Sequence, residues 1–176
     1  MVLENRKSHA NTPDGRPYGV ASENDIFELV ELLFFAYRDF ISDPDEILTE
    51  FKFGRAHHRV LHFVNRNPGM RVTDLLDILK ITKQSLGRVL RQLIDQGFVE
   101  QREGTADRRQ RLLYLTDAGQ VLANRLAAPQ LKRMAAAIGF CDEDGRSTAR
   151  AFLYNLIDAA ERGKVETIVR PPQQNT

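Results

Sequence analysis

Residues 81–99, ITKQSLGRVLRQLIDQGFV, combine the period of an amphipathic helix with a polar start. At about 3.6 residues per turn, the leucines of this stretch share one face, and the opposite face carries Gln84, Arg88 and Arg91. The first turn is rich in hydrogen-bonding side chains, namely Thr82, Lys83, Gln84 and Ser85. The pattern predicts a helix that packs on its leucines and presents amide, hydroxyl and cationic groups outward.

The residue types on the outer face are those that bind DNA. In the major groove glutamine pairs with adenine and arginine with guanine, while serine bonds to bases or phosphates. Lys83 and the free N–H groups at the helix start suit a phosphate. The alternative is a surface helix with a solvated polar face. Three features argue against it. The outer face of this helix carries no acid before Asp95, a short helix precedes the stretch, and a basic hairpin follows it.

The segments on either side complete a helix-turn-helix with a wing. Residues 72–79 predict a short helix with Thr73 as its N-cap, joined to the next helix by a tight turn. Residues 98–103 and 110–115 predict two strands of a hairpin with a longer loop. The hairpin carries the arginines Arg102, Arg108, Arg109 and Arg111. Arginine on an exposed loop can enter a narrow minor groove, and Asp107 is placed to orient Arg109.

Long helical patterns flank this central part. Residues 24–41 are apolar over more than one face, so we expect them to be buried on several sides, for instance between two subunits. Further helices are expected over residues 53–65, over residues 117–138 with Thr116 as N-cap, and over residues 147–162. The expected fold class is mainly α with a small β-hairpin wing.

Charge is segregated along the 176 residues, although the net charge is only +1. Residues 54–113 carry twelve Lys or Arg and six Asp or Glu. Residues 1–53 carry five and eleven, and residues 114–176 carry eight and seven. A basic middle part predicts a polyanionic partner for that part alone.

The composition also argues against several classes of protein. No apolar run approaches the ~20 residues of a membrane span, and the N-terminus lacks the apolar core of a secretory signal. The single cysteine, Cys141, rules out a disulfide framework and a multi-cysteine zinc site, so a cytoplasmic location is the simplest expectation. Without a nucleophile motif or a Gly-rich phosphate loop, we expect neither an enzyme nor a cofactor.

The chain resembles the MarR family of winged helix-turn-helix transcriptional regulators over roughly residues 24–162. The wing signature of that family, D-x-R followed by L-T-x-x-G, is matched by Asp107, Arg109, Leu115, Thr116 and Gly119. The resemblance implies a homodimer whose N- and C-terminal helices interlock. It also implies binding to a short palindrome in double-stranded DNA, as a repressor or an activator, with half-sites about one turn apart.

Carried over by motif, the resemblance makes Gln84, Ser85 and Arg88 base-reading candidates, Arg109 the minor-groove arginine and Asp107 its orienting partner. The complete set of DNA-binding candidates is Thr82, Lys83, Gln84, Ser85, Arg88, Arg91, Arg108, Arg109 and Arg111. The alternative is a winged-helix adaptor that binds proteins without specific DNA binding.

The domain organisation expected from the sequence has five parts. They are a flexible arm (1–22), an N-terminal dimerisation helix (23–52), the winged DNA-binding domain (53–116), C-terminal dimerisation helices (117–165) and a flexible tail (166–176).

For three groups of residues the sequence leaves open whether their role is structural or functional. His57, His58 and His62 are expected to be structural or dimer contacts rather than metal ligands, because no companion ligand motif is visible. Cys141 is expected to be a half-buried structural residue; family members that sense peroxides carry a cysteine near the start of the first helix, where this chain has none. The third group either belongs to the core or lines a site for a small aromatic or phenolic effector: Phe34, Phe35, Tyr37, Phe40, Phe51, Phe53 and Phe63.

Overall fold

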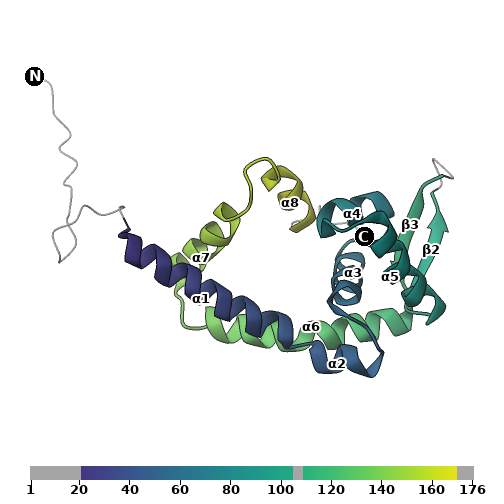
Figure 1. Ribbon diagram of the computed structural model, residues 1–176, viewed down its shortest axis with the longest axis horizontal. Helices are drawn as coiled ribbons and strands as arrows, with labels where there is room; N and C mark the ends of the chain where they lie inside the picture. Colours follow the sequence, from purple (N-terminus) through teal and green to yellow (C-terminus); the bar gives the residue numbers. More distant parts are fainter. Residues whose placement is uncertain (1–20, 105–108, 170–176) are drawn as a thin grey trace, which may run out of the picture. The chain divides into compact units, whose positions relative to one another are not determined.

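The computed structural model describes residues 21–104 and 109–169 (Figure 1). It forms two units, residues 1–39 and 40–176, and each is described by itself. The domain boundaries expected from the sequence stay predictions.

The first unit contains most of helix α1 (Glu23–Ser42). Its start is held by reciprocal bonds: the Ser22 backbone N–H donates to the Asp25 carboxylate (2.8 Å), and the Asp25 N–H donates to the Ser22 hydroxyl (3.1 Å). No residue of α1 is buried. Its exposed apolar side chains include Ile26, Phe27, Leu29, Val30, Leu32, Leu33, Phe34, Phe35 and Tyr37. The burial expected for this helix is therefore not provided by its own unit.

The second unit holds the remaining helices and the sheet (Figure 1). The helices are α2 (Asp45–Glu50), α3 (Arg55–Arg66), α4 (Val72–Leu79), α5 (Lys83–Asp95), α6 (Asp117–Ile138), α7 (Glu143–Asn155) and α8 (Arg162–Val169). The strands are β1 (Met70–Arg71), β2 (Val99–Glu103) and β3 (Arg111–Leu115). They form an antiparallel sheet in the order β1-β3-β2, in which Met70 and Gln101 both pair with Leu113.

The core lies where α3, α5, α6 and β3 meet. The side chains of Leu61 on α3, Leu86 and Leu93 on α5, Leu113 on β3 and Leu126 on α6 are fully buried. Burying one leucine contributes roughly 1.5–3 kcal/mol, so the apolar stripe of α5 fixes this helix on the unit. The prediction that α5 packs on its leucines is confirmed.

Several local predictions are confirmed, and two are wrong. The bounds of α4 match, and Thr116 caps α6. Thr73, however, is not the N-cap of α4: β1 keeps Arg71 extended, so Arg71 takes the cap position and pairs with Asp74 (2.7 Å). The last long helix covers Glu143–Asn155 instead of residues 147–162. It begins earlier because the Asp142 side chain accepts a bond from Gly145 N–H (2.7 Å) and caps it.

Helix α8 was not expected from the sequence. Arg162 starts it and donates to two carbonyl groups, those of Asn155 at the end of α7 (2.9 Å) and of Ile157 just after it (3.0 Å). Ion pairs Lys80–Glu161 (3.3 Å) and Lys164–Asp77 (3.9 Å) link this region to α4. The helix depends on contacts distant in sequence, which local periodicity does not reveal.

The open groups of residues are only partly assigned by the structure. Phe53 is buried and stacks with Phe51 at 5.9 Å, which agrees with the core interpretation for these two rings. Cys141 is half-buried, as expected. In the part of the chain that the structure describes, no three His, Cys, Asp or Glu are arranged to hold a metal ion. No described helix is long and apolar enough to cross a membrane.

His58 is a buried histidine on α3 whose Nε2 atom has no hydrogen-bond partner within the described ranges. The pKa of His58 is lowered to about 4, mainly by burial and also by the neighbouring His62, while Asp45 opposes the shift. The folded protein therefore holds His58 neutral, whereas the unfolded chain takes up a proton near pH 6.5.

We expect stability to fall as the pH is lowered from about 6.5 towards 4, because only the unfolded chain gains this proton. Replacing His58 by leucine removes the group and should flatten the fall in melting temperature between pH 7 and pH 5. Thermal melts of both proteins across that range test this. Equal slopes for the two proteins would show that His58 does not bind its proton differently in the folded and unfolded states.

Candidate nucleic-acid interface

The turn between α4 and α5 fixes the start of the outward-facing helix. Lys80 ends α4 in the left-handed region (φ 51°), and its N–H donates to the carbonyl of Leu76 (3.0 Å). Thr82 caps α5: its hydroxyl accepts from the Ser85 N–H (3.1 Å) and donates to the Ser85 hydroxyl (2.9 Å). The Ser85 hydroxyl keeps its own hydrogen for a ligand, while Thr82 serves mainly to position the helix.

The outer face of α5 is polar and carries cations without acidic partners. Lys83, Gln84, Ser85, Arg88 and Arg91 are all exposed. Within the described part of the chain, Lys83, Arg88 and Arg91 form no ion pair. Three neighbouring unneutralised cations on a fixed helix favour an anionic partner.

Other cations of the same unit are neutralised by acids close to them. Arg125 pairs with Glu50 (2.6 Å), and Arg133 pairs with Asp43 (2.7 Å). The Arg133 guanidinium holds the pKa of the Asp43 carboxyl below its ordinary value, mainly through their hydrogen bond. Charge pairing is therefore common elsewhere on this unit, and the outer face of α5 departs from it.

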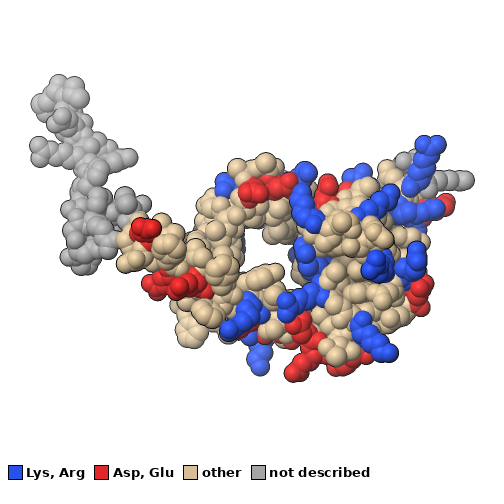
Figure 2. All heavy atoms as spheres, in the orientation of Figure 1, with Lys and Arg blue, Asp and Glu red and all other residues tan. Residues whose placement is uncertain are grey.

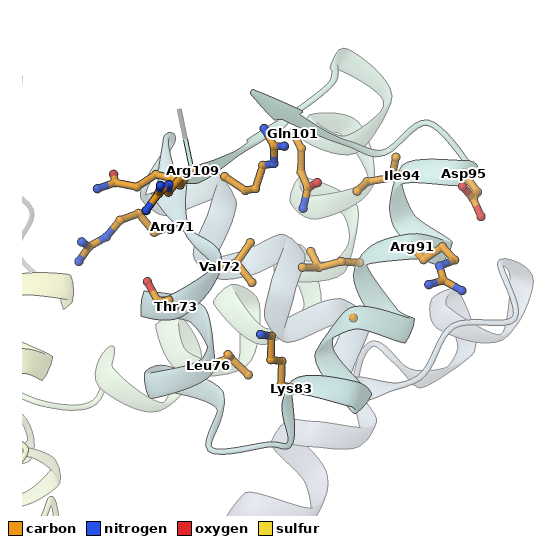
Figure 3. Close-up of a pocket in the computed structure, with 14 residues that line it drawn as sticks. Arg71, Val72, Thr73, Leu76, Lys83, Arg91, Ile94, Asp95, Gln101 and Arg109 are labelled. Carbon is orange, nitrogen blue, oxygen red and sulfur yellow. The ribbon is translucent and has the colours of Figure 1, made fainter. Parts of the chain in front are cut away.

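A groove of about 790 Å³ separates α5 from α4 and the hairpin (Figure 3). Its floor is apolar, with Val72, Leu76, Leu90 and Ile94. Five cations line it: Arg71, Lys83, Arg91, Arg109 and Arg111. Figure 3 shows the Lys83 side chain pointing into the groove, whereas Arg91 is turned outward. In Figure 2, Lys and Arg side chains gather over this end of the second unit.

The hairpin uses two of its arginines internally. Arg102 pairs with Glu100 and lies over the Tyr114 ring, 4.4 Å from its centroid. Arg111 pairs with Glu103 (2.8 Å). Arg102 therefore braces the hairpin rather than lining the groove. Arg111 lines the groove, but with its charge partly compensated.

The structure brings most of the predicted site together, with two exceptions. Arg108 and Asp107 lie outside the described residues, so the orientation of Arg109 by Asp107 stays a prediction. Arg71 also lines the groove, although the sequence interpretation did not select it. Only the pairing of β1 with β3 could have indicated this residue, because it brings Arg71 opposite Leu112, next to Arg111.

Comparison with known proteins places this geometry in a family. A family model described as MarR family matches residues 52–110. The HTH-type transcriptional regulator PetP of Rhodobacter capsulatus is 45% identical over 150 residues, which cover 85% of this chain and 90% of PetP. The chain belongs to the MarR family of transcriptional regulators.

Solved structures of MarR proteins share the fold. A crystal structure of MarR has 22% identity and a TM-score of 0.59, and the match covers 84% of this chain and 98% of MarR. A MarR-family regulator from Listeria monocytogenes, complexed with 26mer DNA, has 17% identity and a TM-score of 0.64, with 84% and 97% covered. These likenesses confirm the winged-helix fold predicted for this MarR-family chain.

Proposed function

We propose that this MarR-family regulator binds double-stranded DNA by placing α5 in the major groove and the hairpin beside it. One observation carries the proposal: among the residues that the structure describes, Lys83, Arg88 and Arg91 form no ion pair, and they lie on the outer face of a helix whose opposite face is buried. The Listeria relative, complexed with DNA, supports it. The side chains assigned to DNA are Thr82, Lys83, Gln84, Ser85, Arg88, Arg91, Arg108, Arg109 and Arg111.

The proposal includes a homodimer that binds a palindromic operator. The apolar side chains of α1 are exposed, and so are those near the α6–α7 turn and along α7, namely Leu131, Met134, Phe140, Phe152, Leu153 and Leu156. The Phe140 side chain is the most exposed of these, at 93%. Exposed apolar surface on this scale favours association, and a second copy supplies matching helices. Two-fold symmetry would then place the two copies of α5 roughly 10 base pairs apart.

Control by a small aromatic or phenolic effector also belongs to the proposal. An effector that binds one arrangement of the dimer more tightly than the other would change the distance between the two copies of α5, and hence the affinity for the operator. The cytoplasm is the location at which such a regulator meets DNA.

The division of labour on α5 gives the test of the proposed function. We expect Gln84→Ala to change base preference at particular operator positions, because a free amide reads adenine. Lys83→Ala should weaken binding to all duplexes by a similar factor, because an ammonium group contacts phosphate without reading sequence.

The measurement is fluorescence anisotropy with a duplex selected from genomic fragments, its single-base variants and a random duplex. Uniform losses from both substitutions would reject the division of labour. If the wild-type chain bound none of these duplexes at low salt but did bind a protein partner, the adaptor alternative would replace the proposal.

A further inference from the structure

The imidazole of His57, on α3, is held on three sides. It is buried and stacks on the Phe53 ring, with centroids 4.5 Å apart and planes 5° from parallel. The Gly54 backbone N–H donates to its Nδ1 atom (3.1 Å). Its Nε2 atom lies 2.7 Å from the Oε1 atom of Gln92, on the helix α5 proposed to read DNA.

These contacts settle the protonation of the ring and the orientation of the amide. A backbone N–H can only donate, so Nδ1 of His57 carries no proton. The proton of the neutral ring is then on Nε2, which donates to Gln92. The atom of Gln92 that receives this bond must be its oxygen, so the NH₂ group of the amide is the part left for other partners. Gln92 itself is exposed.

Gln92 differs in this respect from Gln84 on the same helix. Gln84 is exposed and makes no side-chain hydrogen bond within the described part of the chain, so its amide offers both a donor and an acceptor. Reading adenine requires both groups at once, because the base presents a donor beside an acceptor. In Gln92 the bond from His57 instead occupies one lone pair of the oxygen and fixes the orientation of the amide, so the NH₂ donors are the groups left facing outward.

The position of Gln92 on α5 agrees with a contact to the DNA backbone. It lies one turn after Arg88 and two turns after Ser85, on the same edge of the helix. It stands eight residues beyond Gln84, about 12 Å along the axis, whereas the N-terminal residues of a recognition helix are those that contact base edges. With the start of α5 in the groove, Gln92 therefore reaches the rim, where phosphate oxygens accept hydrogen bonds.

We propose that His57 holds the Gln92 amide with its NH₂ group outward, so that Gln92 donates a hydrogen bond to a DNA phosphate at the rim of the major groove. The inference rests on the proposed function and assigns a new contact within it. Gln92 is the contact residue, and His57 is a positioning residue that acts through it. The pair contributes affinity without sequence preference, whereas Gln84 contributes preference.

The test compares Gln92→Met with Gln84→Met, two exposed sites on one helix with the same change. Gln92→Met should weaken the selected duplex and a random duplex by the same factor, about tenfold per half-site, because each half-site loses one bond to a charged group. Gln84→Met should lose discrimination at particular base pairs. A scan with single methylphosphonates should find one neutralised phosphate per half-site that weakens the wild-type protein but not Gln92→Met.

The role of His57 is tested through its coupling to Gln92. His57→Phe keeps the stacking on Phe53 and removes both ring nitrogens. Loss of the bond from Gly54 N–H lowers the stability of the α3 start, which thermal melts measure, whereas DNA binding should weaken through Gln92. The double variant should then bind no more weakly than Gln92→Met alone, a non-additive result. ¹⁵N spectra of the wild-type protein provide a readout that does not depend on the variant folding, and they should show the proton on Nε2 of His57.

Several outcomes would overturn the inference while leaving the proposed function intact. They are wild-type affinity in Gln92→Met, a loss confined to particular base pairs, additive effects of the two substitutions, or a proton on Nδ1 of His57. If the wild-type protein bound no duplex, the proposed function would fail first, and the inference with it.

Discussion

Replacing Gly119 by alanine is expected to destabilise the second unit by about 3 kcal/mol or more, the upper end for an overpacked site. A Cβ atom at this position would lie 1.9 Å from the carbonyl oxygen of Phe98 and 3.3 Å from the Cβ of Leu115. Neither neighbour can move freely. The Phe98 carbonyl accepts from the Thr116 N–H (3.2 Å), and the Thr116 hydroxyl accepts from Gly119 N–H (3.0 Å). This close approach is the physical reason for the glycine in L-T-x-x-G.

The measurement is thermal or denaturant unfolding, with a drop of roughly 6–12 °C in melting temperature expected for a chain of this length. Gly87→Ala is the matched control, because a Cβ at that exposed position of α5 meets nothing within 4 Å. It should leave the protein as stable as the wild type or up to about 1 kcal/mol more stable, since alanine favours helix. A Gly119→Ala protein that melts with the wild type would contradict the close packing of α6 on the turn before β2.

Replacing Arg109 by alanine should weaken operator binding by roughly 1–3 kcal/mol without unfolding the dimer. Arg109 lines the groove beside α5, on an exposed part of the hairpin from which an arginine can enter the minor groove. Fluorescence anisotropy with the selected duplex measures the loss.

Arg102→Ala is the control within the same hairpin. The Arg102 side chain is engaged with Glu100 and the Tyr114 ring and does not line the groove. Its removal should therefore change operator affinity much less than the removal of Arg109. Equal losses from the two substitutions would mean that the hairpin contributes only general positive charge. No loss of affinity in Arg109→Ala would show that Arg109 does not contact the DNA.

The parts of the fold that were predictable have signals within a few residues of sequence. The leucine spacing of α5 and the cap Thr116 involve neighbours three or four positions apart, and the structure confirms both. By contrast, β1 has two residues and exists only through its pairing with β3, more than forty positions away. The misassigned cap at Thr73 follows from that missing strand.

The candidate site divides in the same way. The outward face of α5 follows from helical period, so Lys83, Gln84 and Arg88 could be selected from sequence alone. Two features could not be selected. The groove between α4, α5 and the hairpin depends on tertiary packing, and the bond between His57 and Gln92 joins residues 35 positions apart. Both residue types are common on polar surfaces, and only their geometry distinguishes them.

The central claim is that two copies of this chain hold α5 and its hairpin against adjacent turns of one duplex. Footprinting of the purified protein on a selected genomic fragment, with the mass of the complex determined in parallel, tests it most directly. The account predicts two subunits per duplex, protection of two inverted half-sites roughly 10 base pairs apart, and affinity that falls steeply with salt. A single subunit that protects no sequence over any other, even at low ionic strength, would contradict it.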